Sequence, residues 1–139
     1  MTRELVRLVR ERAREQCEYC RLPQSAFPFS FQLDHILAEK HGGATVDSNL
    51  ALACPHCNRH KGPNIAGVDP HSGQLVRLFH PRLDRWSEHF QWQGAYLVGR
   101  TPIGRVTIQV LAMNAHDQQI VREELLREGR QLDDGVTFG

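Results

Sequence analysis

Two Cys-x-x-Cys motifs constrain the fold of this 139-residue chain more than any other feature. The motifs Cys17-Glu-Tyr-Cys20 and Cys54-Pro-His-Cys57 are thirty-three residues apart and contain all four cysteines of the sequence. Four thiolates can surround one Zn²⁺ tetrahedrally at about 2.3 Å, and because Zn²⁺ has no redox chemistry such a closed site is structural. We therefore predict one structural zinc site, with the ligands Cys17, Cys20, Cys54 and Cys57.

Other uses of the four cysteines remain open at this stage. The separation of the two motifs would also suit a rubredoxin-like iron site, although a glycine usually follows each Cys-x-x-Cys motif in such sites. Arg21 and Asn58 occupy those positions in this chain. Unligated buried cysteines or a thiol-disulfide pair are further alternatives, but they leave the pairing of the two motifs unexplained.

Length and composition predict one soluble globular domain, residues 1–139, that does not cross a membrane. The chain is 40% hydrophobic and 24% charged, and it has no apolar run near the roughly 20 residues that a membrane span needs. The N-terminal stretch MTRELVRLVRERAREQ lacks the continuous apolar segment of a secretory signal. We therefore expect a cytoplasmic location, where cysteine pairs are more often metal or redox groups than structural disulfides.

The charge distribution leaves a basic surface possible but does not require one. The net charge is only +1. Residues 1–115 contain 14 Lys and Arg against 10 Asp and Glu, whereas residues 116–139 contain 3 against 6. Solvated surface is an equally good explanation of these charges.

The sequence around the motifs predicts a strand, a loop, a second strand and a short helix. Residues 31–36 and 50–53 are short apolar segments, and the polar loop between them contains a Gly-Gly pair. Pro55 suits the first turn of a helix over residues 55–61, which Gly62 and Pro63 would end. An amphipathic helix capped by Thr2 is expected to precede Cys17.

The remaining sequence predicts a small β region followed by helices, and so an α+β fold. The segments HFQW and AYLV are expected to flank a two-residue turn at Gln93-Gly94. Residues 101–111 suit a helix capped by Thr101, although the run RVTIQV also alternates like a strand. A last helix is predicted over residues 116–128, and Trp86, Phe90 and Trp92 are expected in the core.

Three polar residues between and after the motifs could form a reactive site. Asp34 and His35 are adjacent on the first strand, so their side chains should point to opposite faces. If the short helix folds back over this strand, Asn58 approaches Asp34, and a carboxylate with an amide oxygen suits Mg²⁺ or Mn²⁺. His35 could take a proton from water near neutral pH. Each residue alone is a weak signal, because lone histidines and asparagines are usually structural.

Taken together, LDHI, the Gly-Gly loop, SNLALAC and CPHCNRHKG resemble the motif of the HNH endonucleases. The resemblance implies a ββα-metal fold in the version that four cysteines brace around a structural zinc. The motif core covers residues 17–62. Residues 63–139 resemble the C-terminal part of small bacterial HNH proteins, and we expect them to pack on the core as an extension.

The resemblance also implies a role for individual residues. His35 would be the general base, Asp34 a ligand of the catalytic divalent metal, and Asn49 the residue that holds the loop and the orientation of His35. Asn58 stands at the third motif position, where many members have histidine, and it would be the second metal ligand. His60 is a fallback ligand, and Lys61, Arg59 and His60 are candidates for binding the substrate phosphate.

The implied function is metal-dependent hydrolysis of phosphodiester bonds in double-stranded DNA, with a structural Zn²⁺ and a catalytic Mg²⁺ or Mn²⁺. The products would carry a 3′ hydroxyl and a 5′ phosphate. A non-catalytic, zinc-stabilised module that binds nucleic acid is the main alternative, and a rubredoxin-like electron carrier is a third. The sequence does not indicate the target site or the oligomeric state.

Overall fold

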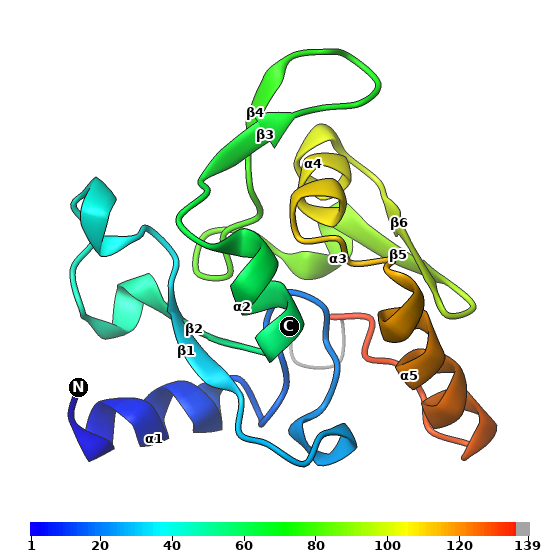
Figure 1. Cartoon of the computed structure of the whole chain (residues 1–139), viewed down its shortest axis with the longest axis horizontal. Helices are drawn as coiled ribbons and strands as arrows, with labels where there is room; N and C mark the ends of the chain where they lie inside the picture. Colours follow the sequence, from blue (N-terminus) through cyan, green and yellow to red (C-terminus); the bar gives the residue numbers. More distant parts are fainter. Residues whose placement is uncertain (136–139) are drawn as a thin grey trace.

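The computed structural model describes residues 1–135 and combines helices with small antiparallel sheets (Figure 1). Three hairpins of two strands each form separate sheets within these residues. In chain order, the helices and strands are α1 (Arg3–Arg12), β1 (Gln32–His35), β2 (Leu50–Ala53), α2 (Pro55–Lys61), β3 (Ala66–Val68), β4 (Leu75–Arg77), α3 (Trp86–His89), β5 (Phe90–Gln93), β6 (Tyr96–Gly99), α4 (Pro102–Val110) and α5 (His116–Arg127).

The centre of the fold is a β1–β2 hairpin followed directly by α2, as the sequence predicts. The strands are antiparallel, with Asp34 opposite Ala51 and His35 opposite Leu50. All four residues of β2 are buried, and α2 packs against both strands. This arrangement, together with the cluster of four cysteines, confirms the expected α+β fold of the ββα-metal type.

Local sequence explains where α2 begins and ends. Pro55 occupies its first turn, where the missing N–H costs nothing, and the Cys54 sulfur accepts a hydrogen bond from the N–H of Cys57. At the other end, Gly62 has a φ of 49°, a conformation that glycine adopts without strain. The helix therefore covers the predicted residues 55–61 and rises from the second cysteine motif.

Helix α1 also begins where it was expected, with the Thr2 hydroxyl accepting a hydrogen bond from the N–H of Leu5 at 3.2 Å. Val9 and Ala13 are buried, and the helix lies against β2. The apolar face of this helix is narrow, because Leu8 is 44% exposed. The helix thus contributes a narrow contact to the core and presents arginines to solvent.

The hairpin β3–β4 projects from the molecule and is fastened to α4 at its turn (Figure 1). Both oxygens of the buried Asp69 carboxylate accept hydrogen bonds from the Arg105 guanidinium, at 2.9 and 3.0 Å. These hydrogen bonds lower the pKa of Asp69, so the pair stays charged over the physiological pH range. The hairpin is therefore anchored at its turn although its strands are short.

The β5–β6 hairpin corrects the predicted turn by one residue. Gln93 pairs with Tyr96, so the two connecting residues are Gly94 and Ala95 and not Gln93 and Gly94. Gly94 has a φ of 62°, which suits glycine at the first position of such a turn. In the paired strand β5, Phe90 is buried and Gln91 is exposed, as the alternation of side chains along a strand requires.

Residues 102–110 form a helix, so the strand alternative for RVTIQV is wrong. The Thr101 hydroxyl caps α4 by accepting a hydrogen bond from the N–H of Gly104 at 3.0 Å, and burial of Val106 and Thr107 holds the helix on the core. The short helix α3 was not expected from the sequence. Packing explains it, because Trp86 at its start is buried against Phe90 with ring centres 5.0 Å apart.

The C-terminal extension is joined to the first cysteine motif through the same tryptophan. The indole N–H of Trp86 donates a hydrogen bond to the backbone carbonyl of Tyr19 at 2.8 Å, with both residues buried. The extension therefore packs directly on the motif core.

None of the helices within residues 1–135 has the length and apolar character to span a bilayer.

Candidate metal and catalytic site

The four cysteines converge into one buried cluster. Their sulfur atoms lie within 4.8 Å of one another, and those of Cys20 and Cys54 are 3.7 Å apart. A tetrahedral site with bonds of about 2.3 Å places its sulfurs roughly 3.8 Å apart. In each motif the second cysteine donates its backbone N–H to the first sulfur, at 3.4 Å. The cluster therefore has the size and the ligand set of a tetrahedral thiolate metal site.

The electrostatics of the cluster also favour a bound cation. Hydrogen bonds from the other sulfurs, aided by burial, raise the pKa of the Cys54 and Cys57 thiols. Although burial opposes it, hydrogen bonds from the same neighbours lower the pKa of Cys17. Cys17 is thus favoured as a thiolate, and Cys54 and Cys57 are favoured as thiols. A divalent cation would supply the missing charge and allow all four to bind as thiolates.

The two residues between the cysteines of the first motif fasten the cluster to the β1–β2 hairpin. Glu18 donates its N–H to the Leu52 carbonyl at 2.8 Å and accepts the N–H of Leu52 on its side chain at 2.7 Å. The Tyr19 hydroxyl donates to the Asp34 carboxylate at 2.7 Å. Arg82 of the extension also pairs with Glu18. The first cysteine motif is therefore bonded to both strands of the hairpin, of which β1 carries Asp34 and His35.

Asn49 holds the long loop between β1 and β2 in place. Its side chain accepts the N–H of Leu37 and donates to the carbonyls of Leu37 and Ala44, all at 2.9 Å. Gly43 fits this arrangement for steric reasons, since a Cβ there would lie 1.7 Å from the Leu37 carbonyl oxygen. Asn49 thus fixes the backbone after His35 but has no hydrogen bond to the imidazole.

Thr45, which the sequence did not single out, contacts the imidazole directly. The Thr45 hydroxyl lies 2.9 Å from Nε2 of His35, and a Glu39 carboxylate oxygen lies 3.7 Å from the same nitrogen. The His35 side chain is 20% exposed, so its ring reaches solvent from the end of β1. With Nε2 held by the loop, Nδ1 is the ring nitrogen left to exchange a proton.

Asp34 points into the protein, as its alternation with His35 predicts, and it has two buried partners. Lys61 of α2 places Nζ 3.1 Å from one carboxylate oxygen and 3.3 Å from the other. The Tyr19 hydroxyl reaches the first of these oxygens from the opposite motif. Burial raises the pKa of Asp34, while the charge of Lys61 opposes that shift. The pair with Lys61 therefore keeps a buried carboxylate in its charged form.

Asp34, His35 and Asn58 line the same cavity of about 300 Å³ at the junction of β1 with α2. Asn58 donates its amide nitrogen to the side chain of Gln32 in β1, which turns the amide group across the strand. No donor to the Asn58 amide oxygen is found among residues 1–135. The cavity thus brings together a carboxylate, an imidazole and a free amide oxygen.

These donors fit a hard divalent cation. Mg²⁺ and Mn²⁺ bind oxygen ligands, usually one or two carboxylate or amide groups from the protein, and complete their shell with water and phosphate. Asp34 has one oxygen, Oδ1, whose only partner within the described chain is Lys61 at 3.3 Å, and Asn58 adds its amide oxygen. The open cavity leaves room for the water and phosphate ligands.

The structure corrects the predicted substrate contact of Lys61 and places the fallback metal ligand His60 outside the cavity of Asp34. Lys61 is 1% exposed and pairs with Asp34, so it cannot reach a phosphate from solvent. His60 stacks on His56 at 4.1 Å between ring centres and places Nδ1 2.8 Å from the His56 carbonyl. It does not line the cavity of Asp34, so the structure does not bring the fallback ligand to the site.

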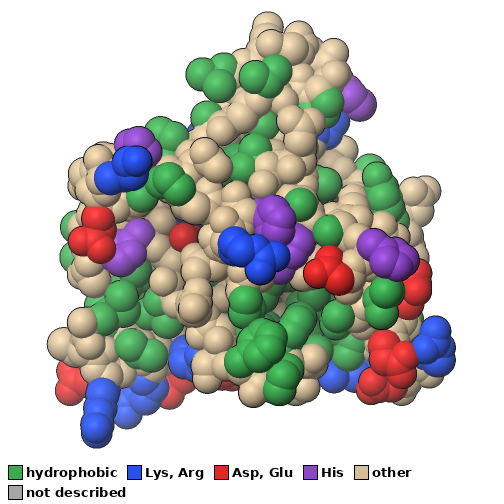
Figure 2. Space-filling view, viewed as in Figure 1, with side chains coloured by type: hydrophobic (Ala, Val, Ile, Leu, Met, Phe, Trp, Pro, Cys, Tyr) green, Lys and Arg blue, Asp and Glu red, His purple; other side chains and the backbone are tan. Residues whose placement is uncertain are grey.

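Arg59 is the one predicted phosphate contact in α2 that stays at the surface. Its side chain is exposed, and no partner for it is found in the described part of the chain. Basic and histidine side chains gather over α2 in the middle of the face shown in Figure 2. At the basic end of this helix, which carries Arg59, His60 and Lys61, the exposed Arg59 is therefore available to an anionic ligand.

The contacts with Tyr19, Lys61 and Thr45 were missed by sequence reasoning. Tyr19 was read only as a spacer between two cysteines, and Thr45 as part of a polar loop. Lys61 was noticed, but a lysine near a nuclease motif suggests a surface role, whereas here it is buried. The available signal was its spacing, because residue 61 is four residues after Cys57 and so lies on the same face of α2.

The buried pair predicts a large stability effect of Lys61. We expect Lys61→Met to lower the free energy of unfolding by about 3–5 kcal/mol, because it leaves the Asp34 carboxylate buried without its cation. Urea denaturation of the zinc-loaded protein measures this. Lys40→Met, at the other and exposed lysine of the chain, should change it by less than about 0.5 kcal/mol. Equal stability of the two variants would contradict the pairing.

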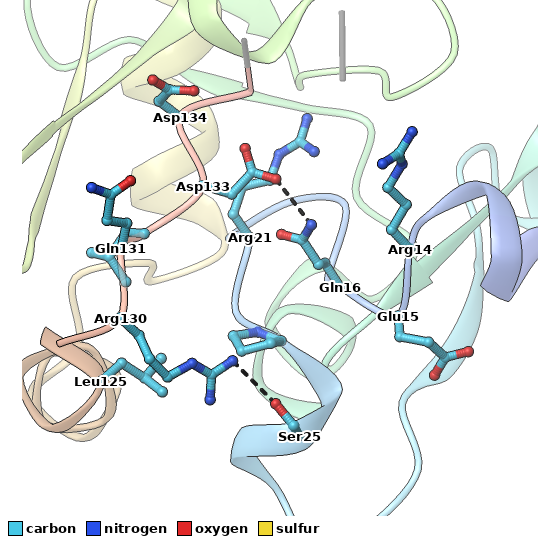
Figure 3. A pocket seen from close by; sticks show the side chains of 12 residues that line it. Arg14, Glu15, Gln16, Arg21, Ser25, Leu125, Arg130, Gln131, Asp133 and Asp134 are labelled. Carbon is cyan, nitrogen blue, oxygen red and sulfur yellow. Dashed lines mark hydrogen bonds between the residues drawn. The ribbon is translucent and has the colours of Figure 1, made fainter. Parts of the chain in front are cut away.

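Another cavity, of about 500 Å³, is separate from these residues and lies beside the first cysteine motif (Figure 3). Residues 14–25 and the segment after α5 form its walls. Gln16 donates a hydrogen bond to Asp133 at 2.9 Å, and Arg130 donates to Ser25 at 3.2 Å. Among the described residues that line it, none belongs to the predicted catalytic set. We therefore assign it to the packing of the C-terminal segment.

Comparison with known proteins identifies the motif core. The family model of the HNH endonucleases matches residues 17–64, which include both cysteine motifs, the β1–β2 hairpin and α2. The match does not extend over the C-terminal part, for which a resemblance was also expected. No curated protein and no solved structure matched the chain. Residues 17–64 are thus similar to the HNH endonuclease family, and their four clustered cysteines are consistent with its zinc-braced version.

Proposed function

We propose that this protein is a metal-dependent endonuclease that hydrolyses phosphodiester bonds of double-stranded DNA, with His35 as general base. The cysteine cluster would bind Zn²⁺ as a structural ion, and the cavity would bind Mg²⁺ or Mn²⁺. The observation that carries the proposal is the convergence of Asp34, His35 and Asn58 on one open cavity within a domain of the HNH family.

The residues divide the work of the reaction between them. Asp34 and Asn58 would hold the divalent ion, which when bound supplies positive charge to the phosphate oxygens. His35 would accept the proton of the attacking water at Nδ1, because Nε2 lies against the Thr45 hydroxyl. Glu39, 3.7 Å from Nε2, would stabilise the imidazolium that forms. Arg59 would contact a phosphate of the bound strand, because its side chain is exposed at the same helix.

The direct test is nicking of supercoiled plasmid with Mg²⁺ or Mn²⁺, with and without EDTA. We expect nicking that depends on the added metal, and loss of it with EDTA at concentrations that leave the zinc in place. Metal-dependent nicking of plasmid but not of a matched RNA substrate would support DNA as the substrate. Binding of DNA without nicking under any of these metals would favour the non-catalytic module.

The cavity residues predict separate effects on the two metal sites. Asp34→Asn and Asn58→Ala should raise the metal concentration needed for half-maximal nicking by at least tenfold, with one Zn²⁺ retained per chain, because neither residue is a ligand of the cysteine site. Asp34→Asn is preferred to Asp34→Ala, since the buried Lys61 and Tyr19 need a polar partner. His60→Ala is the matched control in α2. A strong effect of His60→Ala with none of Asn58→Ala would move the second ligand to His60.

A further inference from the structure

Tyr19 is held by two hydrogen bonds, one at its backbone carbonyl and one at its side-chain hydroxyl. The cysteine site alone requires neither of them. The residue is fully buried between Cys17 and Cys20. Its carbonyl accepts the indole N–H of Trp86 at 2.8 Å, and its hydroxyl donates to Asp34 at 2.7 Å. A phenylalanine could fill the same space in the core, so the buried hydroxyl has a specific partner and not only a packing role.

The contact is made to the one carboxylate that lines the catalytic cavity from within β1. The hydroxyl is the donor, because an ionised carboxylate can only accept. It engages Oδ2 of Asp34, and Oδ1 is contacted by Lys61 at 3.3 Å and receives no hydrogen bond from Tyr19. A hydrogen bond of this kind orients a metal-binding carboxylate and sets which of its oxygens is free.

The second cysteine motif reaches the same carboxylate from the other side. Lys61 lies at the end of the helix that Cys54 and Cys57 begin, and it contacts both Asp34 and the His35 carbonyl, the latter at 3.1 Å. Asp34 thus contacts one residue from each of the two segments that carry the cysteines. Both residues are close to their cysteines, because Tyr19 lies inside the first motif and Lys61 lies one helical turn after the second motif.

We propose that Tyr19 is a positioning residue, which holds the Asp34 carboxylate for the catalytic divalent metal and thereby makes that metal site depend on the order of the structural cysteine site. The inference rests on the proposed function, in which Asp34 is a ligand. Tyr19 itself touches neither metal nor substrate. Its loss should weaken binding of the catalytic metal while the cysteine site keeps its zinc.

The experiment is a Mn²⁺ titration followed by electron paramagnetic resonance of the free ion, on zinc-loaded protein without DNA. We expect Tyr19→Phe to raise the Kd for Mn²⁺ by 10- to 100-fold, the range usual for partners of metal-binding side chains. Zinc content and the far-ultraviolet circular dichroism should be unchanged. The matched control is Tyr96→Phe, which removes the other tyrosine hydroxyl of the chain, at a half-exposed position on β6, and should leave the Kd unchanged.

A second measurement keeps the test valid if Tyr19→Phe does not fold. The chain contains two tyrosines, so labelling with tyrosine carrying ¹³C at the ring carbon that bears the hydroxyl gives two signals, which the Tyr96→Phe spectrum assigns. Titration of the unmutated protein with Mg²⁺ should shift the Tyr19 signal, because its hydroxyl is bonded to a ligand of the metal. The Tyr96 signal should not move.

The results separate this inference from the proposed function. If the unmutated protein binds Mn²⁺ and nicks plasmid, Asp34→Asn abolishes both, and Tyr19→Phe binds Mn²⁺ within twofold of the unmutated Kd, the positioning role is overturned and the nuclease stands. An unshifted Tyr19 signal at saturating Mg²⁺ would overturn it in the same way. Absence of Mn²⁺ binding by the unmutated protein would overturn both proposals.

Discussion

Purified His35→Ala is expected to nick plasmid about 10²–10⁴ times more slowly than the unmutated protein, which is the range for loss of a general base. The physical reason is that His35 would accept a proton from the attacking water, and no other histidine lines the same cavity in the described part of the chain. Nicking rates at saturating Mg²⁺ and equal protein concentration measure the effect.

The fold should survive this substitution, which makes the prediction specific. The His35 side chain is at the end of β1 and partly exposed, and its hydrogen bond is to the exposed loop residue Thr45. Zinc content and the thermal midpoint should hardly change. His41→Ala, in the same loop but exposed, is the matched control and should cut at the normal rate. If His35→Ala nicks as fast as the unmutated protein, the catalytic reading of the site is wrong.

The second large effect concerns the cysteine cluster, where Cys57→Ser is expected to abolish folding and with it all nicking. Apparent binding free energies of structural Zn²⁺ in small thiolate sites are about 10–16 kcal/mol at pH 7, whereas whole domains are stable by about 5–15 kcal/mol. The cluster also lies in the core, next to β2 and the first motif. Losing one ligand should therefore cost most of the stability of the domain.

Circular dichroism and zinc analysis test this prediction together. One Zn²⁺ per chain is expected in the unmutated protein purified without chelator, and none or a weakly held ion in Cys57→Ser. Cys20→Ser, in the other motif, should behave alike because both cysteines belong to one site. A strong chelator at elevated temperature should reproduce the unfolding. Native circular dichroism of a zinc-free protein would show that the cysteines are structural without a metal.

The motif core could be predicted from the sequence because its signals are local. Cysteine spacing, Pro55 and Gly62 at the ends of α2, and the Thr2 and Thr101 caps act within a few residues, so the chain around them has few alternatives. The family match over residues 17–64 agrees with this reading. The one-residue error at the β5–β6 turn shows the limit, since Gln93-Gly94 and Gly94-Ala95 are both plausible turns until the strands pair.

The arrangement around Asp34 and His35 was decided only by the tertiary structure. Which of Asn58, His60 and Lys61 would meet Asp34 depends on how α2 is rotated over the hairpin, and that rotation is set by the cysteine cluster at the start of the helix. The same packing buries Lys61, turns His60 toward His56 and brings Tyr19 to Asp34. A sequence names the groups that can react or bind a metal. Long-range packing determines which of them share a cavity, because the energy of those contacts comes from residues far apart in the chain.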